Sequence, residues 1–245
     1  MINYLVSEKY RLFRRKPLYV SSGIFLMISS VITLMYKNMS DSFFESTWLF
    51  YFTNLLITVV ASFFMVVIFN SLLMGKNDNV LKHAISFGIS KPTIFLAKLS
   101  LSLSVFLGII LVSVVVTVIL GEALFTADPE TLQNYLVSLV NFLPLLISIF
   151  VLGYVLSLLQ VSQIFVVSTL LLTYVLAGEL LQAILSLFSK NEQISKYYPS
   201  NLIAEVVNQF MERRVSYMLE NWLVSMLVVT LCLIIGLRLF NRKEF

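Results

Sequence analysis

Six long apolar runs, each with at most one charged residue, constrain the fold of this chain more than any other feature. Charged residues make up only 12% of its 245 residues, whereas a soluble domain carries about 25%. Only helices and closed barrels satisfy every backbone polar group in lipid, and these runs are too long and too uniformly apolar for barrel strands. The sequence therefore predicts an all-α integral membrane protein with six transmembrane helices. The predicted spans are Pro17–Tyr36, Trp48–Met74, Thr93–Leu120, Leu136–Leu159, Val161–Phe188 and Asn221–Phe240.

Basic residues are distributed unevenly between the two sides that six spans define. Twelve lysines and arginines lie at the termini and in the even-numbered connections, including Lys98 at the edge of one connection, against five on the other side. The connection with Glu122, Asp128 and Glu130 contains no basic residue. Because cytoplasmic segments carry the excess of lysine and arginine, both termini are predicted to lie in the cytoplasm. The net charge of +4 follows from this topology and does not indicate nucleic-acid binding.

Residues 1–245 are expected to form a single transmembrane domain, with residues 1–16 as an interfacial elbow helix at its start. One stripe of this helix is apolar apart from one lysine and is predicted to lie on the lipid: Ile2, Leu5, Val6, Lys9, Leu12 and Phe13. The polar residues are predicted to face away from that stripe: Asn3, Ser7, Glu8, Arg11, Arg14 and Arg15. In the alternative interpretation, the basic residues here only determine the topology.

The fifth apolar run is too long for one straight span. Its 28 residues would reach about 42 Å as a helix, against about 30 Å of hydrocarbon. Gly178-Glu179 is predicted to divide the run, so that Glu179–Phe188 dips back into the membrane or lies at its surface. A further amphipathic helix is predicted after Pro199, and residues 179–219 would then form a small external cap.

A short polar and basic segment, Gly75–Pro92, interrupts the apolar runs on the predicted cytoplasmic side. Gly88 suits a left-handed helix C-terminus, Ser90 can cap a new helix, and Pro92 is tolerated in its first turn. The pattern therefore predicts a short amphipathic helix, a stop and a restart. The start of the first helix can be capped by Asn77, Asp78 or Asn79, and its apolar face comprises Val80, Leu81, Ala84, Ile85 and Gly88. A plain linker needs no such face, so the segment is predicted to bind a partner; the alternative is a solvated loop.

The motifs of ATP-binding and catalytic proteins are missing from the sequence. There is no G-x-x-x-x-G-K-[ST], no G-x-S-x-G, no H-E-x-x-H and no pair of acids within the apolar runs. His83 and Cys232 are the only histidine and the only cysteine, which removes most zinc, haem, thiol-cluster and histidine-dependent arrangements. No catalytic, cofactor-binding or metal-binding residue is therefore assigned, and the chain is not expected to be an enzyme.

The layout of the whole chain resembles the membrane subunit of a type-2 ABC exporter, also called type V. The likeness centres on Asn79–Leu99, which is similar to the coupling segment of that family. The matching residues are Gly88, Ser90 and Lys91, for a G-x-S-[RK] turn, and Lys98, for a lysine that enters the next span. The sequence departs from the family pattern where Asn79-Val80 replaces G-T and where the preceding acid is displaced to Asp78.

The resemblance implies a permease subunit of an ATP-driven exporter in a bacterial cytoplasmic membrane. Two such subunits, identical or different, would pair with a dimer of ABC ATPases that binds ATP and Mg, so no cofactor is expected in this chain. The implied substrate is hydrophobic or amphipathic, such as a peptide, toxin, drug or lipid, and exporters of antimicrobial peptides, including lantibiotic-immunity transporters, are the most similar in style. The residues expected to contact the ATPase are Asp78, Val80, Leu81, His83, Ala84, Phe87 and Gly88.

Three residues are candidates for a substrate path: Asn54, Phe63 and Glu179. Asn54 is a polar residue inside a span, where it either lines a path or hydrogen-bonds another helix. Phe63 belongs to a phenylalanine-rich span, and Glu179 is the one acid within an apolar run, either a cation site or an interfacial glutamate. Two other functions stay open: an ion-coupled carrier that uses Glu179, and a membrane scaffold or assembly factor that binds a partner without transport.

Overall fold

The computed structural model describes residues 2–38, 46–74, 78–180, 183 and 195–242 of the chain. Every regular element within these residues is a helix, as the apolar runs predict. The α-helices are α1 (Ile2–Phe13), α2 (Lys16–Asn38), α3 (Ser46–Met74), α4 (Asp78–Ser86), α5 (Lys91–Leu124), α6 (Pro129–Leu158), α7 (Gln163–Leu171), α9 (Pro199–Met211) and α10 (Leu219–Arg242). A π-helical segment, η1 (Leu172–Leu176), continues α7, and a 3-10 turn, η2 (Ser195–Tyr197), precedes α9.

Five helical segments are long and apolar enough to cross a membrane, which indicates a multi-pass membrane protein. These segments match the second to the sixth predicted span: Thr47–Ser71, Lys91–Leu124, Pro129–Leu158, Gln163–Leu180 and Leu219–Arg242. The first predicted span corresponds to α2, of which only Lys16–Ile28 qualifies, as a shorter apolar helix. A sixth span therefore stays a prediction.

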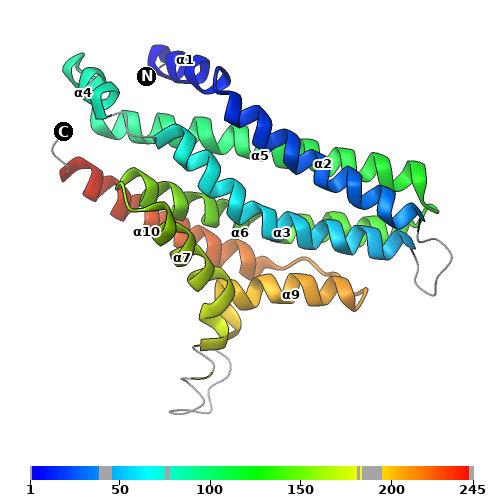
Figure 1. Cartoon of the computed structure of the whole chain (residues 1–245). Helices are drawn as coiled ribbons and strands as arrows, with labels where there is room; N and C mark the ends of the chain where they lie inside the picture. The colour runs from blue at the N-terminus through cyan, green and yellow to red at the C-terminus, as the bar shows by residue number, and fades with distance from the viewer. Residues whose placement is uncertain (1, 39–45, 75–77, 181–182, 184–194, 243–245) are drawn as a thin grey trace.

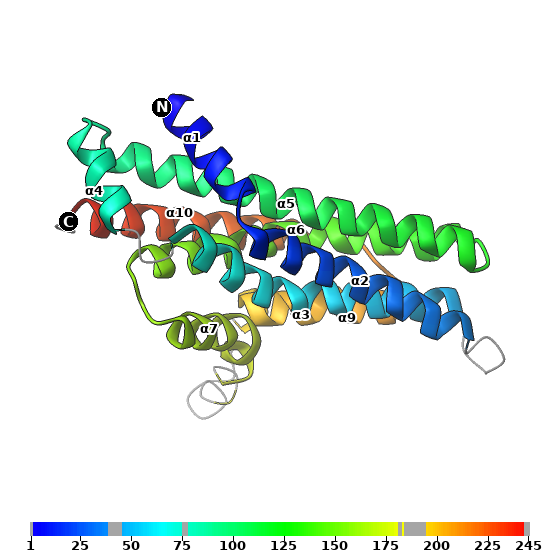
Figure 2. The ribbon, with the colours of Figure 1, turned by 45° about the horizontal axis from the view of Figure 1, so that its top comes forward.

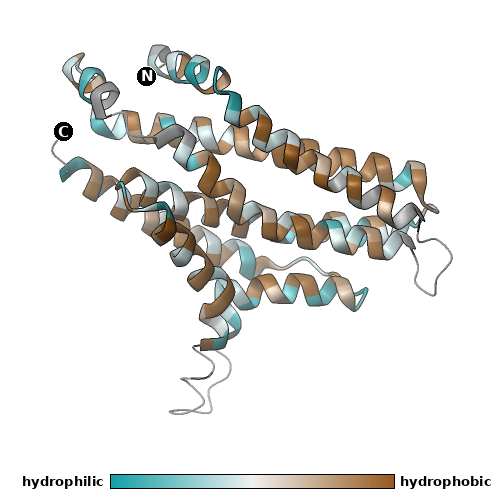
Figure 3. Ribbon diagram, in the orientation of Figure 1, coloured by the Kyte–Doolittle hydropathy of each residue, from teal (hydrophilic) through white to brown (hydrophobic). Residues whose placement is uncertain are grey.

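The central helix of the bundle is α6. In its most apolar 18-residue window 61% of the residues are buried, against 22% for α5 and 17% for α10. Its main neighbours are α3 and α10, and α5, α7 and α9 also contact it. Figures 1 and 2 show α3, α5 and α10 running alongside α6, and Figure 3 shows apolar residues along most of the bundle. The buried face of each helix thus points to α6 or to its immediate neighbours.

Both ends of the described chain lie at the same end of the bundle. Figures 1 and 2 place α1, α4 and the C-terminal end of α10 there, and the connection between α5 and α6 at the opposite end. The side chain of Lys91, at the start of α5, donates a hydrogen bond to the backbone oxygen of Asn241, at 3.1 Å. Ends on one side agree with an even number of spans, while the assignment of that side to the cytoplasm stays a prediction.

The predicted helix, stop and restart within Gly75–Pro92 are confirmed. After α4 the chain turns at Gly88, whose φ of +80° lies in the left-handed region that favours glycine. The side chain of Ser90 then accepts a hydrogen bond from the backbone N–H of Thr93 at 3.4 Å, and Pro92 lies in the first turn of α5. Capping by Asn77 falls outside the described residues.

The predicted polar face of the N-terminal helix is wrong at Glu8. Glu8 was expected to face away from the apolar stripe, yet it is buried against the protein, and Arg11 and Arg15 are partly buried. Val6, a member of that stripe, is 61% exposed, as a side chain that faces lipid would be. The physical reason is that α1 packs against α5 with the side that carries Glu8, which a pattern of polarity within α1 alone does not reveal.

The predicted division of the fifth run at Gly178-Glu179 stays a prediction. The helical residues continue through η1 as far as Leu180, and most of the predicted helix Glu179–Phe188 lies outside the described residues. The amphipathic helix predicted after Pro199 is confirmed as α9. Four residues of its apolar stripe are buried: Leu202, Ile203, Val206 and Phe210. This face packs along α3 and α6.

The start of α6 gives a testable pH dependence. Asp128 is its N-cap: one carboxylate oxygen accepts a hydrogen bond from the backbone N–H of Thr131 at 3.2 Å and the other from its hydroxyl at 2.6 Å. These hydrogen bonds, the hydroxyl contact first, hold the pKa of Asp128 below its usual value. We expect Asp128→Ala to lower the free energy of unfolding by about 1 kcal/mol at pH 7.

A depressed pKa stabilises the folded state only while the group is ionised. Asp128 should therefore contribute this charge-dependent stability fully above its pKa in the unfolded chain, about 4. The contribution should be lost as the pH falls through the lower pKa of Asp128 in the folded protein. Asp128→Asn is the matched control, because asparagine keeps the capping oxygen without a titration. Unfolding in detergent at pH 7 and pH 3 measures both variants, and an Asp128→Ala deficit that is unchanged at pH 3 would contradict the assignment.

Candidate functional site

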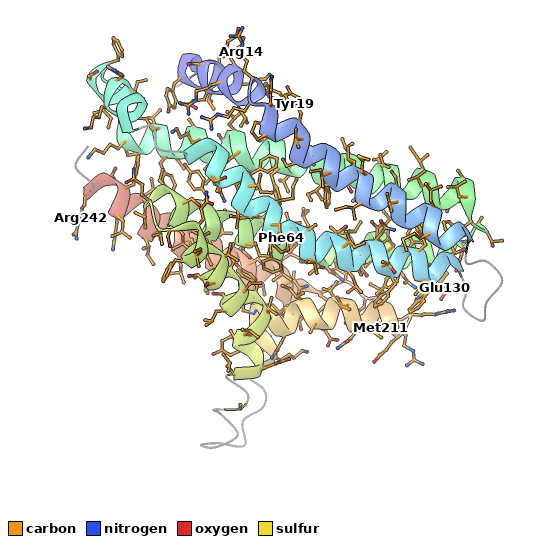
Figure 4. The ribbon with its side chains drawn as sticks, in the orientation of Figure 1. Arg14, Tyr19, Phe64, Glu130, Met211 and Arg242 are labelled. Atoms are coloured by element: carbon orange, nitrogen blue, oxygen red, sulfur yellow. The ribbon has the colours of Figure 1, made fainter. Side chains whose placement is uncertain are left out.

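A deep apolar groove lies between α3, α7 with η1, and α9. Its volume is about 560 Å³, within the range of small-molecule sites. Phe63 and Phe64 contribute from α3, Tyr174 from η1 and Ile203 from α9, and Asn208 is one of the few polar residues at its wall. Figure 4 shows Phe64 on the part of α3 that faces α7. The lining suits an apolar or amphipathic molecule.

The π-helical segment forms one wall of this groove. The ring of Tyr174 meets that of Phe63 edge to face, with centroids 6.3 Å apart. The Tyr174 hydroxyl and the Ser148 hydroxyl of α6 share a hydrogen bond of 2.8 Å, which fixes the wall to the central helix. Segments of π-helix are frequent at functional sites because the extra residue per turn redirects side chains. The pattern of the sequence contains no signal for this turn.

Gly178 allows α9 to approach the end of the fifth span. Its backbone N–H donates a hydrogen bond to the hydroxyl of Ser200 at 2.7 Å. A β-carbon at this position would collide with Ser200 and Asn201. The glycine that suggested a break in the sequence therefore serves as a contact point between two walls of the groove.

The three residues predicted for a substrate path do not come together. Phe63 lines the groove. Asn54 is buried elsewhere and donates a hydrogen bond to the backbone oxygen of Phe50 in the preceding turn, at 2.9 Å. Glu179 is exposed and is not one of the residues that line the groove. The other lining residues, such as Tyr174 and Ile203, come from helices far apart in the sequence, which no local pattern brings together.

The predicted partner-binding helix, α4, presents an exposed surface at the end of the bundle that carries both chain ends. Phe87 is 82% exposed directly after the helix, and Lys82, His83 and Gly88 are also exposed. Ala84, expected on the partner-binding face, is instead 8% exposed and belongs to the protein's own core. The side chains of Asp78, Val80 and Leu81 lie outside the described ones.

A buried charged cluster joins α1 to α5. Lys98, which the sequence places at the edge of a predicted cytoplasmic connection, is 2% exposed. Glu8 of α1 is 3% exposed, is the acid whose charge acts on Lys98, and forms an ion pair of 2.7 Å with Arg11. Burial, together with the charge of Glu8, raises the pKa of Tyr4, and burial beside Arg11 lowers the pKa of Arg15. The cluster therefore contains one acidic group among several cations.

Comparison of the chain with protein-family models, with curated proteins and with solved structures finds no match. The class that the structure defines is thus a multi-pass helical membrane protein with an apolar groove along its bundle and an exposed helix at one end.

Proposed function

We propose that this chain is the permease subunit of an ATP-driven ABC exporter that moves a hydrophobic or amphipathic substrate, such as a peptide, toxin, drug or lipid. The observation that carries this proposal is the unit formed by α4, the Gly88 turn and the start of α5. Ala84 anchors α4 in the core, and the Gly88 turn leads directly into the capped start of α5. Such a unit can transmit a push on an exposed helix to a membrane-spanning helix as rigid-body movement.

In this proposal the energy comes from another chain, because the sequence contains no P-loop. The partner is an ABC ATPase dimer, which binds ATP and Mg on the cytoplasmic side, and a second permease subunit completes the complex. The spans would be six, with α2 as the first and α1 at the membrane surface. Both termini would lie in the cytoplasm of a bacterial cell.

The burial of Ala84 redefines which residues would contact the ATPase. A partner can reach His83, Phe87 and Gly88, which are exposed, whereas Ala84 supports α4 from inside. Phe87 has the properties of an interface anchor, because it is a large aromatic side chain that gains burial only when a partner covers it. The substrate path would be the groove at Phe63 and Tyr174, where apolar walls meet the membrane.

We expect Phe87→Ala to weaken retention of the ATPase about thirtyfold, the loss of an anchor worth about 2 kcal/mol. The measurement is co-purification of ATP-hydrolysing subunits with the tagged chain from its native membranes, followed by titration of the recovered ATPase. Phe165→Ala is the matched control, since Phe165 is also an exposed phenylalanine but lies on α7. Thermal unfolding of all three proteins should coincide.

The proposal fails if no ATP-hydrolysing subunit co-purifies, or if Phe87→Ala retains the ATPase as well as the unmodified chain does. Partner binding without substrate movement in reconstituted vesicles would instead indicate a scaffold. Ion-dependent movement that ignores ATP and is abolished by Glu179→Gln would indicate a carrier.

A further inference from the structure

We infer that the groove between α1 and α5 is a binding site for one anionic phospholipid, separate from the α3–α7–α9 groove and independent of any ATPase partner. The residues that line it are Leu5, Val6 and Lys9 of α1, and Ser100, Leu101 and Ser104 of α5. Its volume of about 260 Å³ accommodates part of an acyl chain and leaves the remainder in the bilayer.

The first argument is charge. Residues 1–16 contain five basic residues and a single acid, and that acid, Glu8, is already paired with Arg11 at 2.7 Å. Lys98 adds a further buried lysine on the α5 side of the same contact. Lys9 is the only charged residue that lines the groove, and it is exposed. Clusters of lysine and arginine beside a spanning helix attract anionic lipid headgroups, and Lys9 can extend its ammonium group to them.

The second argument is the position of α1 relative to the bilayer surface. Tyr10, Phe13 and Tyr19 are 60%, 42% and 57% exposed around the junction of α1 and α2. Exposed tyrosines near the start of a predicted span are typical of the headgroup level of a membrane. The Tyr19 hydroxyl donates to the backbone oxygen of Phe13 at 2.8 Å, which fixes this junction.

Cationic side chains lie at the same level. The guanidinium of Arg14 lies 4.3 Å from the ring centroid of Tyr10. Figure 4 shows Arg14 pointing away from the bundle. Basic and aromatic side chains thus lie on α1, the helix that forms one wall of the apolar groove.

The occupant that fits these features is a phospholipid rather than a protein helix. Its phosphate would contact Lys9, and its chain would cover Leu5, Val6 and Leu101, of which Val6 is 61% exposed. A net negative headgroup is required, because a zwitterionic headgroup brings its own cation to a site that already contains an excess of positive charge. Phosphatidylglycerol therefore binds and phosphatidylcholine does not.

The test is native mass spectrometry of the full-length chain, released from nanodiscs that contain equal amounts of phosphatidylglycerol and phosphatidylcholine. We expect one retained phosphatidylglycerol per chain, and about fivefold weaker retention by Lys9→Gln. Arg242→Gln is the matched control, since Arg242 is exposed at the same end of the bundle but lies on α10 (Figure 4). It should retain the lipid like the unmodified chain.

A second variant tests the apolar part of the site without changing the charge. Ser104→Trp fills the groove from α5 and should reduce lipid retention while Lys9 is intact. Equal retention of the two lipids, or equal losses in Lys9→Gln and Arg242→Gln, would show diffuse electrostatic attraction and overturn the inference. Unchanged retention in both Lys9→Gln and Ser104→Trp would place the lipid elsewhere and overturn it as well.

Discussion

The substitution Glu8→Gln is expected to lower the free energy of unfolding by about 3 kcal/mol, because it removes one partner of a buried ionic contact. The carboxylate of Glu8 lies 2.7 Å from the guanidinium of Arg11. On the opposite helix Lys98 is 2% exposed. Without the Glu8 carboxylate, the positive charges of Arg11 and Lys98 stay at the contact between α1 and α5, which water scarcely reaches. The loss falls at the lower end of the usual range, since the Arg11 side chain is 26% exposed and can regain some hydration.

The charge balance of this contact can be tested by a double-mutant cycle. Lys98→Met alone removes the deeper cation, and the double variant Glu8→Gln with Lys98→Met removes both charges. If the two residues compensate each other, the double variant is more stable than the sum of the single losses predicts, by at least about 1 kcal/mol. Unfolding by SDS in mixed micelles measures the free energy of unfolding of the two single variants and of the double variant. Glu212→Gln, at an exposed acid after α9, is the control and should change stability by less than about 0.5 kcal/mol.

Additive losses in that cycle would mean that Glu8 and Lys98 do not interact. The stability of α1 would then depend on its apolar contacts, chiefly Leu12, which is 1% exposed. The cycle thus distinguishes an electrostatic attachment of α1 from a hydrophobic one.

The faces of α1 illustrate what the sequence could not predict. A helical pattern ranks residues by polarity and assigns the charged face to water. The structure reverses that assignment for Glu8 because α1 packs against α5, a helix that follows about 90 residues later and carries the buried Lys98.

The spans and the α4 turn were predictable because their causes are local. Lipid requires helices wherever a long apolar run crosses it, so five predicted spans have their counterparts among the long helices. Gly88 and Ser90 specify a stop and a restart through their own backbone and side-chain chemistry. Neither prediction requires knowledge of the rest of the molecule.

The apolar groove was only partly accessible from the sequence. Phe63 was proposed for a path because its span is rich in phenylalanine, and it does line the groove. Its opposite wall depends on the π-turn at Tyr174 and on the close approach of α9 at Gly178. The π-turn and the close approach of α9 both depend on packing between segments far apart in the chain. The sequence pattern of one segment therefore predicts neither feature.

The substitution Asn141→Leu is expected to lower the free energy of unfolding by about 3 kcal/mol, because it leaves the buried backbone N–H of Met218 without a partner and removes a hydrogen bond to the backbone of Ser216. Asn141 is 0% exposed in the middle of α6. Its amide nitrogen donates to the backbone oxygen of Ser216 at 2.7 Å, and its amide oxygen accepts from the backbone N–H of Met218 at 2.9 Å. Both partners are main-chain groups just before α10, and Met218 is 4% exposed, so its N–H cannot turn to water.

The loop between α9 and α10, which contains Ser216, provides a second readout. Gln209 of α9 accepts a hydrogen bond from the backbone N–H of Ser216 at 3.2 Å, so α6 and α9 hold the loop between them. Loss of the Asn141 contacts should loosen this loop and speed tryptic cleavage after Arg213 and Arg214, which are exposed. Ser216→Ala is the matched control, because it keeps the backbone oxygen that Asn141 contacts. It should change stability by less than about 0.5 kcal/mol. Equal stability and equal cleavage in Asn141→Leu and Ser216→Ala would show that α10 is positioned by its apolar packing on α6 instead.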